Sequence, residues 1–256
     1  MSDIDESRAP LMDHLVELRG RLIRSVIALL LAFGVCFYFA EHIFSFLVQP
    51  LVRAFGPGEG RLVYTKLYEA FFVEVRVAFF AAFFVAFPII ANQIWAFVAP
   101  GLYAKERRAF LPFLVATPVL FTLGGALAYY VVMPTAFKFF LGYQGDIGGI
   151  EQEALPAVGE YLSLVMHFIL AFGIAFLLPV LLMLLERAGL VTRQQLAKGR
   201  RYAILVAFVI AAVATPPDVL SQFMLAVPLI LLYELSLIAI WFTERRRARQ
   251  SETEAA

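Results

Sequence analysis

Long apolar stretches separated by short polar segments dominate the chain. Six stretches contain no Asp, Glu, Lys or Arg: Val26–Ala40, Val77–Pro100, Ala109–Phe137, Tyr161–Leu185, Tyr202–Pro217 and Val219–Tyr233. A helix that crosses the hydrocarbon core of a bilayer needs about 20 mostly apolar residues. The apolar residues do not alternate with polar ones, as they do in the strands of a membrane barrel. The pattern therefore predicts an all-α integral membrane protein with six transmembrane helices.

Fitting helices to these stretches gives the expected organisation of a single membrane domain, 1–256. The spans are expected at about 22–42, 75–98, 109–134, 161–186, 201–214 and 219–242, with outer segments 43–74 and 135–160 and cytoplasmic loops 99–108 and 187–200. Spans five and six are short, because Tyr202–Ala214 gives only about 20 Å of helix against a core of about 30 Å. We expect local thinning of the bilayer at these two spans, and a kink at Pro228.

The segments beside the spans carry weaker local signals. Residues 11–25 repeat leucine every three or four positions, which predicts an amphipathic helix leading into the first span. Residues 41–55 predict an interfacial helix broken before Pro50, and 64–77 predict helix leading into the second span. The glycine-rich segment 142–153 predicts a flexible tip.

The distribution of basic residues predicts the orientation. Sixteen of the 21 Lys and Arg residues fall in the segments that six spans would place on the side of both termini. Segments next to membrane spans carry more Lys and Arg on the cytoplasmic side. Both termini and the loop "FVAPGLYAKERR", residues 97–108, are therefore expected in the cytoplasm.

Composition and the absence of known motifs argue against an enzyme. The chain has 62% hydrophobic and 16% charged residues and a net charge of +1, which gives no reason to expect a nucleic-acid partner. It contains no nucleophile, nucleotide-binding or zinc-protease motif, and its three histidines lie in different segments. A single cysteine, Cys36, excludes an intrachain disulfide. We expect no cofactor, no metal and no enzymatic activity.

Three carboxylates stand out by position. Glu17 precedes the first span and Glu106 precedes the third, so both are expected at the cytoplasmic membrane surface. Carboxylates there can bind a guanidinium through paired hydrogen bonds. The alternative is that Glu17 pairs with Arg21, and Glu106 with Lys105 or Arg107, since surface ion pairs are common and weak. Glu234 is an intramembrane acid, for which a structural hydrogen bond or a protonated state is the simpler reading.

Five segments together resemble the TatC family, the polytopic core subunit of the twin-arginine protein translocase. They are "HLVELRGRL" (14–22), "FVAPGLYAKERR" (97–108), "GGALAYYVVMPTAF" (124–137), "YLSLVMHFILAFGIAFLLPV" (161–180) and "TPPDVLSQFMLAVPLILLYE" (215–234). The resemblance implies a receptor with a concave cavity facing the membrane, in the bacterial cytoplasmic membrane. Such a receptor binds twin-arginine signal peptides and transports folded proteins with the single-span partners TatA and TatB, driven by the proton-motive force, in a complex with further copies of itself.

The resemblance also implies roles for individual residues. The signal-peptide site would comprise Glu17, Arg19, Phe97, Pro100, Leu102, Tyr103 and Glu106. Partner helices would contact Thr215 and Gln222, and Pro50, Glu69 and Asp218 would be functional positions of the outer face. One position departs from the family: Leu177 stands where an acidic or polar residue often precedes "VP" in span four. A small-solute transporter and a membrane-embedded hydrolase are the alternatives. A transporter would need a polar pathway, but the polar residues of the spans lie at scattered depths, and a hydrolase would need a nucleophile–base pair that no motif supplies.

Overall fold

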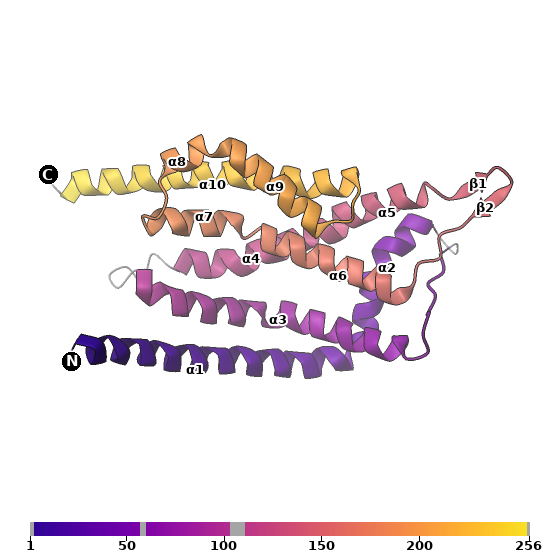
Figure 1. Cartoon of the computed structure of the whole chain (residues 1–256), viewed down its shortest axis with the longest axis horizontal. Coiled ribbons are helices and arrows are strands. Elements are labelled where there is room, and N and C mark those ends of the chain that lie inside the picture. The colour runs from indigo at the N-terminus through magenta and orange to yellow at the C-terminus, as the bar shows by residue number, and fades with distance from the viewer. Residues whose placement is uncertain (1–2, 57–59, 103–110, 255–256) are drawn as a thin grey trace. The chain divides into compact units, whose positions relative to one another are not determined.

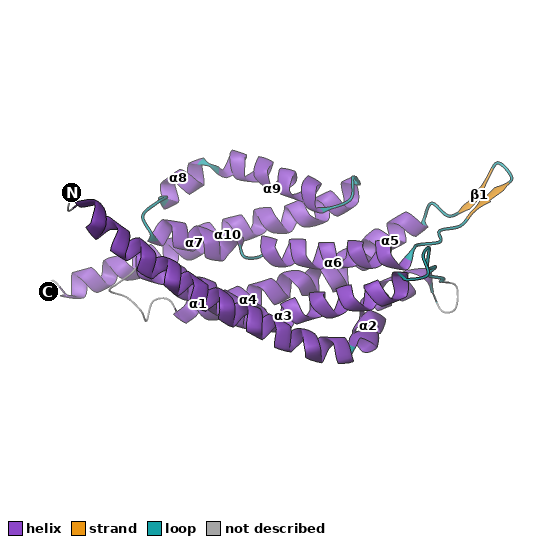
Figure 2. Cartoon of the chain, turned by 60° about the horizontal axis from the view of Figure 1, so that its bottom comes forward, coloured by secondary structure: helices purple, strands orange, loops and turns teal. Residues whose placement is uncertain are grey.

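The computed structural model describes residues 3–56, 60–102 and 111–254, almost entirely as helices (Figures 1 and 2). The helices are α1 (Asp3–Tyr38), α2 (Ala40–Phe55), α3 (Glu69–Leu102), α4 (Leu111–Leu127), α5 (Met133–Leu141), α6 (Val158–Ala175), α7 (Leu178–Arg187), α8 (Arg193–Lys198), α9 (Arg200–Ala214) and α10 (Val219–Glu254). A π-helical turn, η2 (Ala128–Val132), joins α4 to α5, and a hairpin consists of β1 (Gly145–Ile147) and β2 (Ile150–Gln152). The chain divides into two compact units, 1–48 with 64–118, and 49–63 with 119–256.

Five helical segments of the described residues are long and apolar enough to cross a membrane. They are Leu15–Tyr38, Glu69–Phe97, Phe113–Leu141, Val158–Arg187 and Val219–Arg245. The prediction of a helical membrane protein is thus confirmed. The fifth expected span corresponds to α9, whose 15 residues give about 22 Å of helix. Six crossings remain a prediction, because α9 is shorter than the other five segments.

In the first unit, α1 lies alongside α3 (Figure 1). Cys36 of α1 and Ala40, the first residue of α2, are buried together with Ala78 and Ala82 of α3, and each pair is spaced by four residues. Small residues at this spacing let helix backbones approach each other in membranes, where packing rather than hydrophobicity holds helices together.

In the second unit, glycines serve the same purpose between α4 and α6. A Cβ atom added at Gly124 would lie 2.3 Å from the carbonyl oxygen of Phe172, and one added at Gly173 would lie 2.7 Å from the ring of Phe121. Phe121 and Phe172 are themselves fully buried. Each glycine therefore makes room for the helix, or the aromatic ring, opposite it.

The helix from Leu111 to Leu141 is continuous, with one wider turn at η2. The backbone N–H of Met133 bonds to the carbonyl of Ala128, five residues earlier, where an α-helix would bond to the fourth. Beyond it, α5 packs Phe137 against Tyr161 of α6, with ring centroids 5.5 Å apart. The third predicted span thus extends seven residues past its expected end at residue 134.

The glycine-rich segment 142–153, predicted as a flexible tip, forms the antiparallel hairpin β1–β2. Gly148 and Gly149 both have positive φ, 67° and 90°, as a two-residue turn of this kind requires. Asp146 accepts a hydrogen bond from the Gly149 N–H at 2.6 Å. The sequence did not predict this hairpin, because its strands are only three residues long.

Two local predictions were wrong. α2 is not broken before Pro50 but continues through it, and the proline is fully buried, so packing overrides the missing N–H. The helix expected from residue 64 begins only at Glu69. α3 itself continues through Pro100 to Leu102, four residues beyond residue 98, where the second span was expected to end.

Replacing Gly124 with alanine should destabilise the protein, because the new methyl group would collide with the backbone of α6. Overpacking of this kind costs about 1–3 kcal/mol, more than the ~0.5–1 kcal/mol that alanine gains over glycine inside a helix. Thermal unfolding of the purified protein in detergent would measure the loss. Gly34→Ala is the matched control, since nothing lies within 4 Å of its added Cβ; an equal loss in both variants would contradict the packing argument.

Candidate functional site

Glu17 lies on α1, and its carboxylate is held by an arginine one turn further along the same helix. Oε1 of Glu17 accepts a hydrogen bond from Nε of Arg21 at 3.0 Å and a second one from an Nη of the same guanidinium. The side chain of Glu17 is still 38% exposed, whereas that of Arg21 is 20% exposed. The pairing that the sequence offered as the alternative to a binding site is therefore present, with a carboxylate that solvent still reaches.

A surface cavity of about 360 Å³ adjoins this pair. The described residues that line it are Val16, Glu17, Gly20, Arg21 and Arg24. Gly20 contributes open space, because nothing lies within 4 Å of the position of an added Cβ. Arg24 is exposed at the next turn. The cavity thus combines one carboxylate with two guanidinium groups and room for a further side chain.

The other predicted members of the signal-peptide site are only partly described. Arg19 is exposed on α1, and Phe97 lies half-buried in α3. Pro100 and Leu102 belong to the last turns of α3. Tyr103 and Glu106 fall outside the described residues.

A hydrogen bond that the sequence did not predict joins α3 and α4, the helices on either side of residues 103–110, which include Glu106. Nε1 of Trp95 on α3 donates to Oγ1 of Thr117 on α4 at 2.8 Å. That hydroxyl donates in turn to the carbonyl of Phe113 at 2.8 Å. Thr117 is buried, so the bond fixes the distance between α3 and α4. In the sequence, the only indication of this bond is that both Trp95 and Thr117 carry a polar group within a predicted span.

Glu69, predicted as a functional position of the outer face, organises the entry to α3. Its Oε2 accepts hydrogen bonds from the N–H of Thr65 at 2.7 Å, the hydroxyl of Thr65 at 2.9 Å and the N–H of Lys66 at 3.2 Å. These bonds hold residues 65–68 as a turn, which is why the helix starts later than expected. Next to it, Val63 pairs with the chain at Ala157, the residue before α6.

A polar group lies at the turn between α9 and α10. Asp218 caps α10, since its Oδ1 accepts from the N–H of Ser221 at 2.7 Å. Thr215 is buried and donates to Ala211 at 2.8 Å, and Gln222 donates to the carbonyl of α9 residue Phe208 at 3.3 Å. Oδ2 of Asp218 and the hydroxyl of Ser221 are buried without a hydrogen-bond partner among the described residues.

Glu234 forms a paired contact with the first residue of α9. Nε of Arg200 lies 2.7 Å from Oε1 of Glu234, and Nη2 of the same guanidinium donates to Oε2 at 2.9 Å. Beside it, the hydroxyl of Tyr233 donates to the carbonyl of Leu196 at 2.7 Å. The intramembrane acid of the sequence prediction thus has an arginine partner and a side chain that is 40% exposed.

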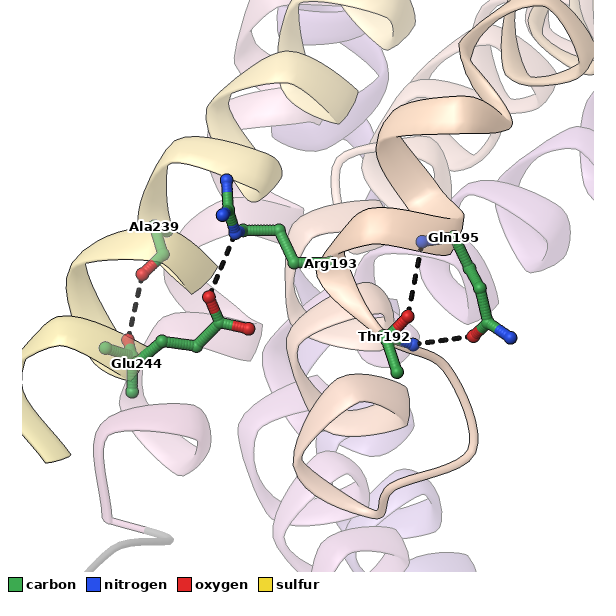
Figure 3. A network of polar contacts seen from close by, with 6 residues as sticks. Thr192, Arg193, Gln195, Ala239 and Glu244 are labelled. Carbon is green, nitrogen blue, oxygen red and sulfur yellow. Dashed lines mark hydrogen bonds and ion pairs between the residues drawn. The ribbon is translucent and has the colours of Figure 1, made fainter. Parts of the chain in front are cut away.

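A second ion pair fixes α8 to α10, as Figure 3 shows. Nε of Arg193 donates to Oε2 of Glu244 at 2.9 Å. A capping box precedes it, in which Thr192 and Gln195 bond to each other's backbone N–H. Leu177, the departure from the family pattern, lies immediately before α7, where the helix of α6 is interrupted.

The described residues include no cluster of three or more His, Cys, Asp or Glu side chains that could hold a metal ion. What the polar groups offer instead is hydrogen bonding between carboxylates and guanidinium groups, at both the α1 and the α8–α10 positions. This chemistry recognises cationic groups.

Comparison with known proteins identifies related chains over nearly the full length. The profile of the family described as Sec-independent protein translocase protein (TatC) matches residues 13–228. A Sec-independent protein translocase protein TatC from Magnetococcus marinus is 51% identical over 98% of this chain and 91% of its own length. The TatC of Aquifex aeolicus is 42% identical over 89% of this chain and 93% of its own.

Solved structures agree with these relatives. Two crystal structures of a twin-arginine translocase receptor, TatC, one of them in the detergent DDM, match with TM-scores of 0.74 and 0.77. Both are 42% identical to this chain and cover 88% of it.

Replacing Glu69 with glutamine should loosen the turn before α3, because the amide cannot accept three hydrogen bonds as strongly as a carboxylate. Hydrogen bonds contribute about 0.5–1.5 kcal/mol each, so the amides of Thr65 and Lys66 should exchange with solvent roughly fivefold faster. Hydrogen–deuterium exchange of this segment would measure it. Glu74→Gln, on an exposed face of the same helix, is the control, and unchanged exchange in the Glu69 variant would rule out the clamp.

Proposed function

Because the chain belongs to the TatC family of Sec-independent protein translocases, we propose that it is the subunit that receives twin-arginine signal peptides. As a member of that family it is a multi-pass membrane component of a protein translocase, and its task is transport rather than catalysis. The observation that carries the receptor proposal is the carboxylate of Glu17. It is partly exposed, already engaged with a guanidinium, and adjoins a cavity with room for another.

In the proposed mechanism, two consecutive arginines of a signal peptide bind Glu17 and Glu106 at the cytoplasmic face. A guanidinium can donate two hydrogen bonds to one carboxylate, so two carboxylates suffice for two arginines. Trp95 and Thr117 support this arrangement, because their hydrogen bond holds the helices on either side of the segment with Glu106. Arg19, Phe97, Pro100, Leu102 and Tyr103 would shape the surrounding surface.

Partners and location follow from the same proposal. TatA and TatB would dock their single helices at the hairpin of α9 and α10, near Thr215 and Gln222, with further copies of the chain in the complex. The protein would lie in the bacterial cytoplasmic membrane with both termini in the cytoplasm, as the basic residues predict. The outer-face residues Pro50, Glu69 and Asp218 would act by holding α2, α3 and α10 in place.

The receptor proposal predicts that Glu17→Gln and Glu106→Gln each weaken binding of a twin-arginine peptide. Losing one charge-assisted contact, worth about 1.5 kcal/mol, reduces affinity roughly tenfold. Titration of a fluorescent peptide onto the full chain in nanodiscs would measure the dissociation constants. Glu153→Gln, an exposed acid beside the β-hairpin, should leave them unchanged. Undiminished binding by the double variant would remove both residues from the site.

The partner proposal predicts position-specific crosslinking at the hairpin. A photoreactive side chain in place of Gln222 should crosslink to a TatA or TatB helix. Gln222 is only half-buried, and it belongs to the polar group at the α9–α10 turn, where these helices would dock. The same probe in place of Leu225, fully buried one turn later, is the control. Equal crosslinking at both positions, or none at Gln222, would place the partner helices elsewhere.

A further inference from the structure

We propose that Arg21 is a built-in competitor for Glu17, which an arginine of the incoming peptide must displace. This inference rests on the proposed function, since it concerns the same carboxylate. It adds a role for a residue that the receptor proposal leaves out: Arg21 sets the affinity that a cationic segment must exceed before it occupies the site.

The geometry of the pair supports this role. Arg21 presents Nε and one Nη of its guanidinium to the same oxygen, Oε1 of Glu17. A ligand arginine would use the same kind of edge, because guanidinium groups bind carboxylates through neighbouring N–H donors. Arg21 therefore occupies, from within the helix, the contact that the peptide would make.

The strength of the pair makes displacement possible. Ion pairs four residues apart on a helix contribute little, and although Arg21 is only 20% exposed, Glu17 keeps more than a third of its side chain in solvent. The cavity beside the pair, widened by the absence of a side chain at Gly20, provides space for the exchange. Arg21 can therefore release the carboxylate without disturbing the backbone of α1.

Competition has a defined consequence for affinity. A resident competitor weakens every ligand of the same carboxylate by one common factor, so it raises the threshold for binding without changing the ratio between ligands. Measured strengths of exposed ion pairs correspond to a factor of roughly two to five. A segment with one cationic residue gains less from the site than a segment with two and falls below this threshold first.

The test uses Arg21→Gln in the full chain, reconstituted in nanodiscs, with a synthetic peptide that carries two consecutive arginines before an apolar segment. The variant should bind the peptide roughly two- to fivefold more tightly than wild type. Arg21→Lys keeps the charge but offers a single ammonium group, so it should shift the affinity in the same direction by less. Arg24→Gln removes an equal charge from the same cavity without a hydrogen bond to Glu17 in the described structure, and should change affinity less than Arg21→Gln.

A double-mutant cycle separates competition from charge repulsion. In a Glu17→Gln background the gain from Arg21→Gln should disappear, because the carboxylate that Arg21 competes for is gone. A gain that persists there, an equal gain in Arg24→Gln, or unchanged binding by Arg21→Gln would each overturn the proposal. Weaker binding by Arg21→Gln would also overturn it, since Arg21 would then orient Glu17 for the ligand. Absence of saturable binding to wild type would instead refute the receptor function on which it rests.

Discussion

The structure depends on one constraint: backbone polar groups inside a bilayer must find partners within the protein. The chain leaves the regular α-helix at several points of its apolar segments, and the ends of α6 and α9 show how hydrogen bonding continues there. The N–H of Phe176 still bonds to the carbonyl of Phe172 where α6 ends, and that of Thr215 bonds to Ala211 where α9 ends. At both of these helix ends, the backbone N–H group therefore keeps a partner within the protein.

Four acids follow a second rule: each carboxylate is held by an arginine or by nearby N–H and hydroxyl groups. Glu17 is paired within α1, and Glu69 accepts the hydrogen bonds that hold the turn before α3. Glu234 joins α10 to the first residue of α9, and Glu244 joins α10 to α8. Such contacts are individually weak where solvent reaches them. A carboxylate held this way is oriented in advance and remains open to exchange, which suits a surface that must bind and release a ligand.

The sequence predicted the helical membrane architecture because long uncharged stretches leave few alternatives, and it identified the family because five separate segments match in order. It also named Glu17 and its possible partner Arg21. It could not predict that α2 continues through Pro50, because burial of the proline ring depends on neighbours distant in the chain. The Trp95–Thr117 bond and the Arg200–Glu234 pair were missed for the same reason. Each joins residues more than 20 positions apart, and the sequence alone does not indicate which distant residue each one contacts.

The π-helical turn at η2 has a consequence for everything that follows it in the same helix. It holds one residue more than an α-helical turn would, and each residue rotates a helix by about 100°. Without that insertion, the face of α5 that carries Phe137 would point away from Tyr161, and the aromatic contact between them would be lost. Inserting or deleting one residue at η2 would therefore rotate all nine side chains of α5 about the helix axis.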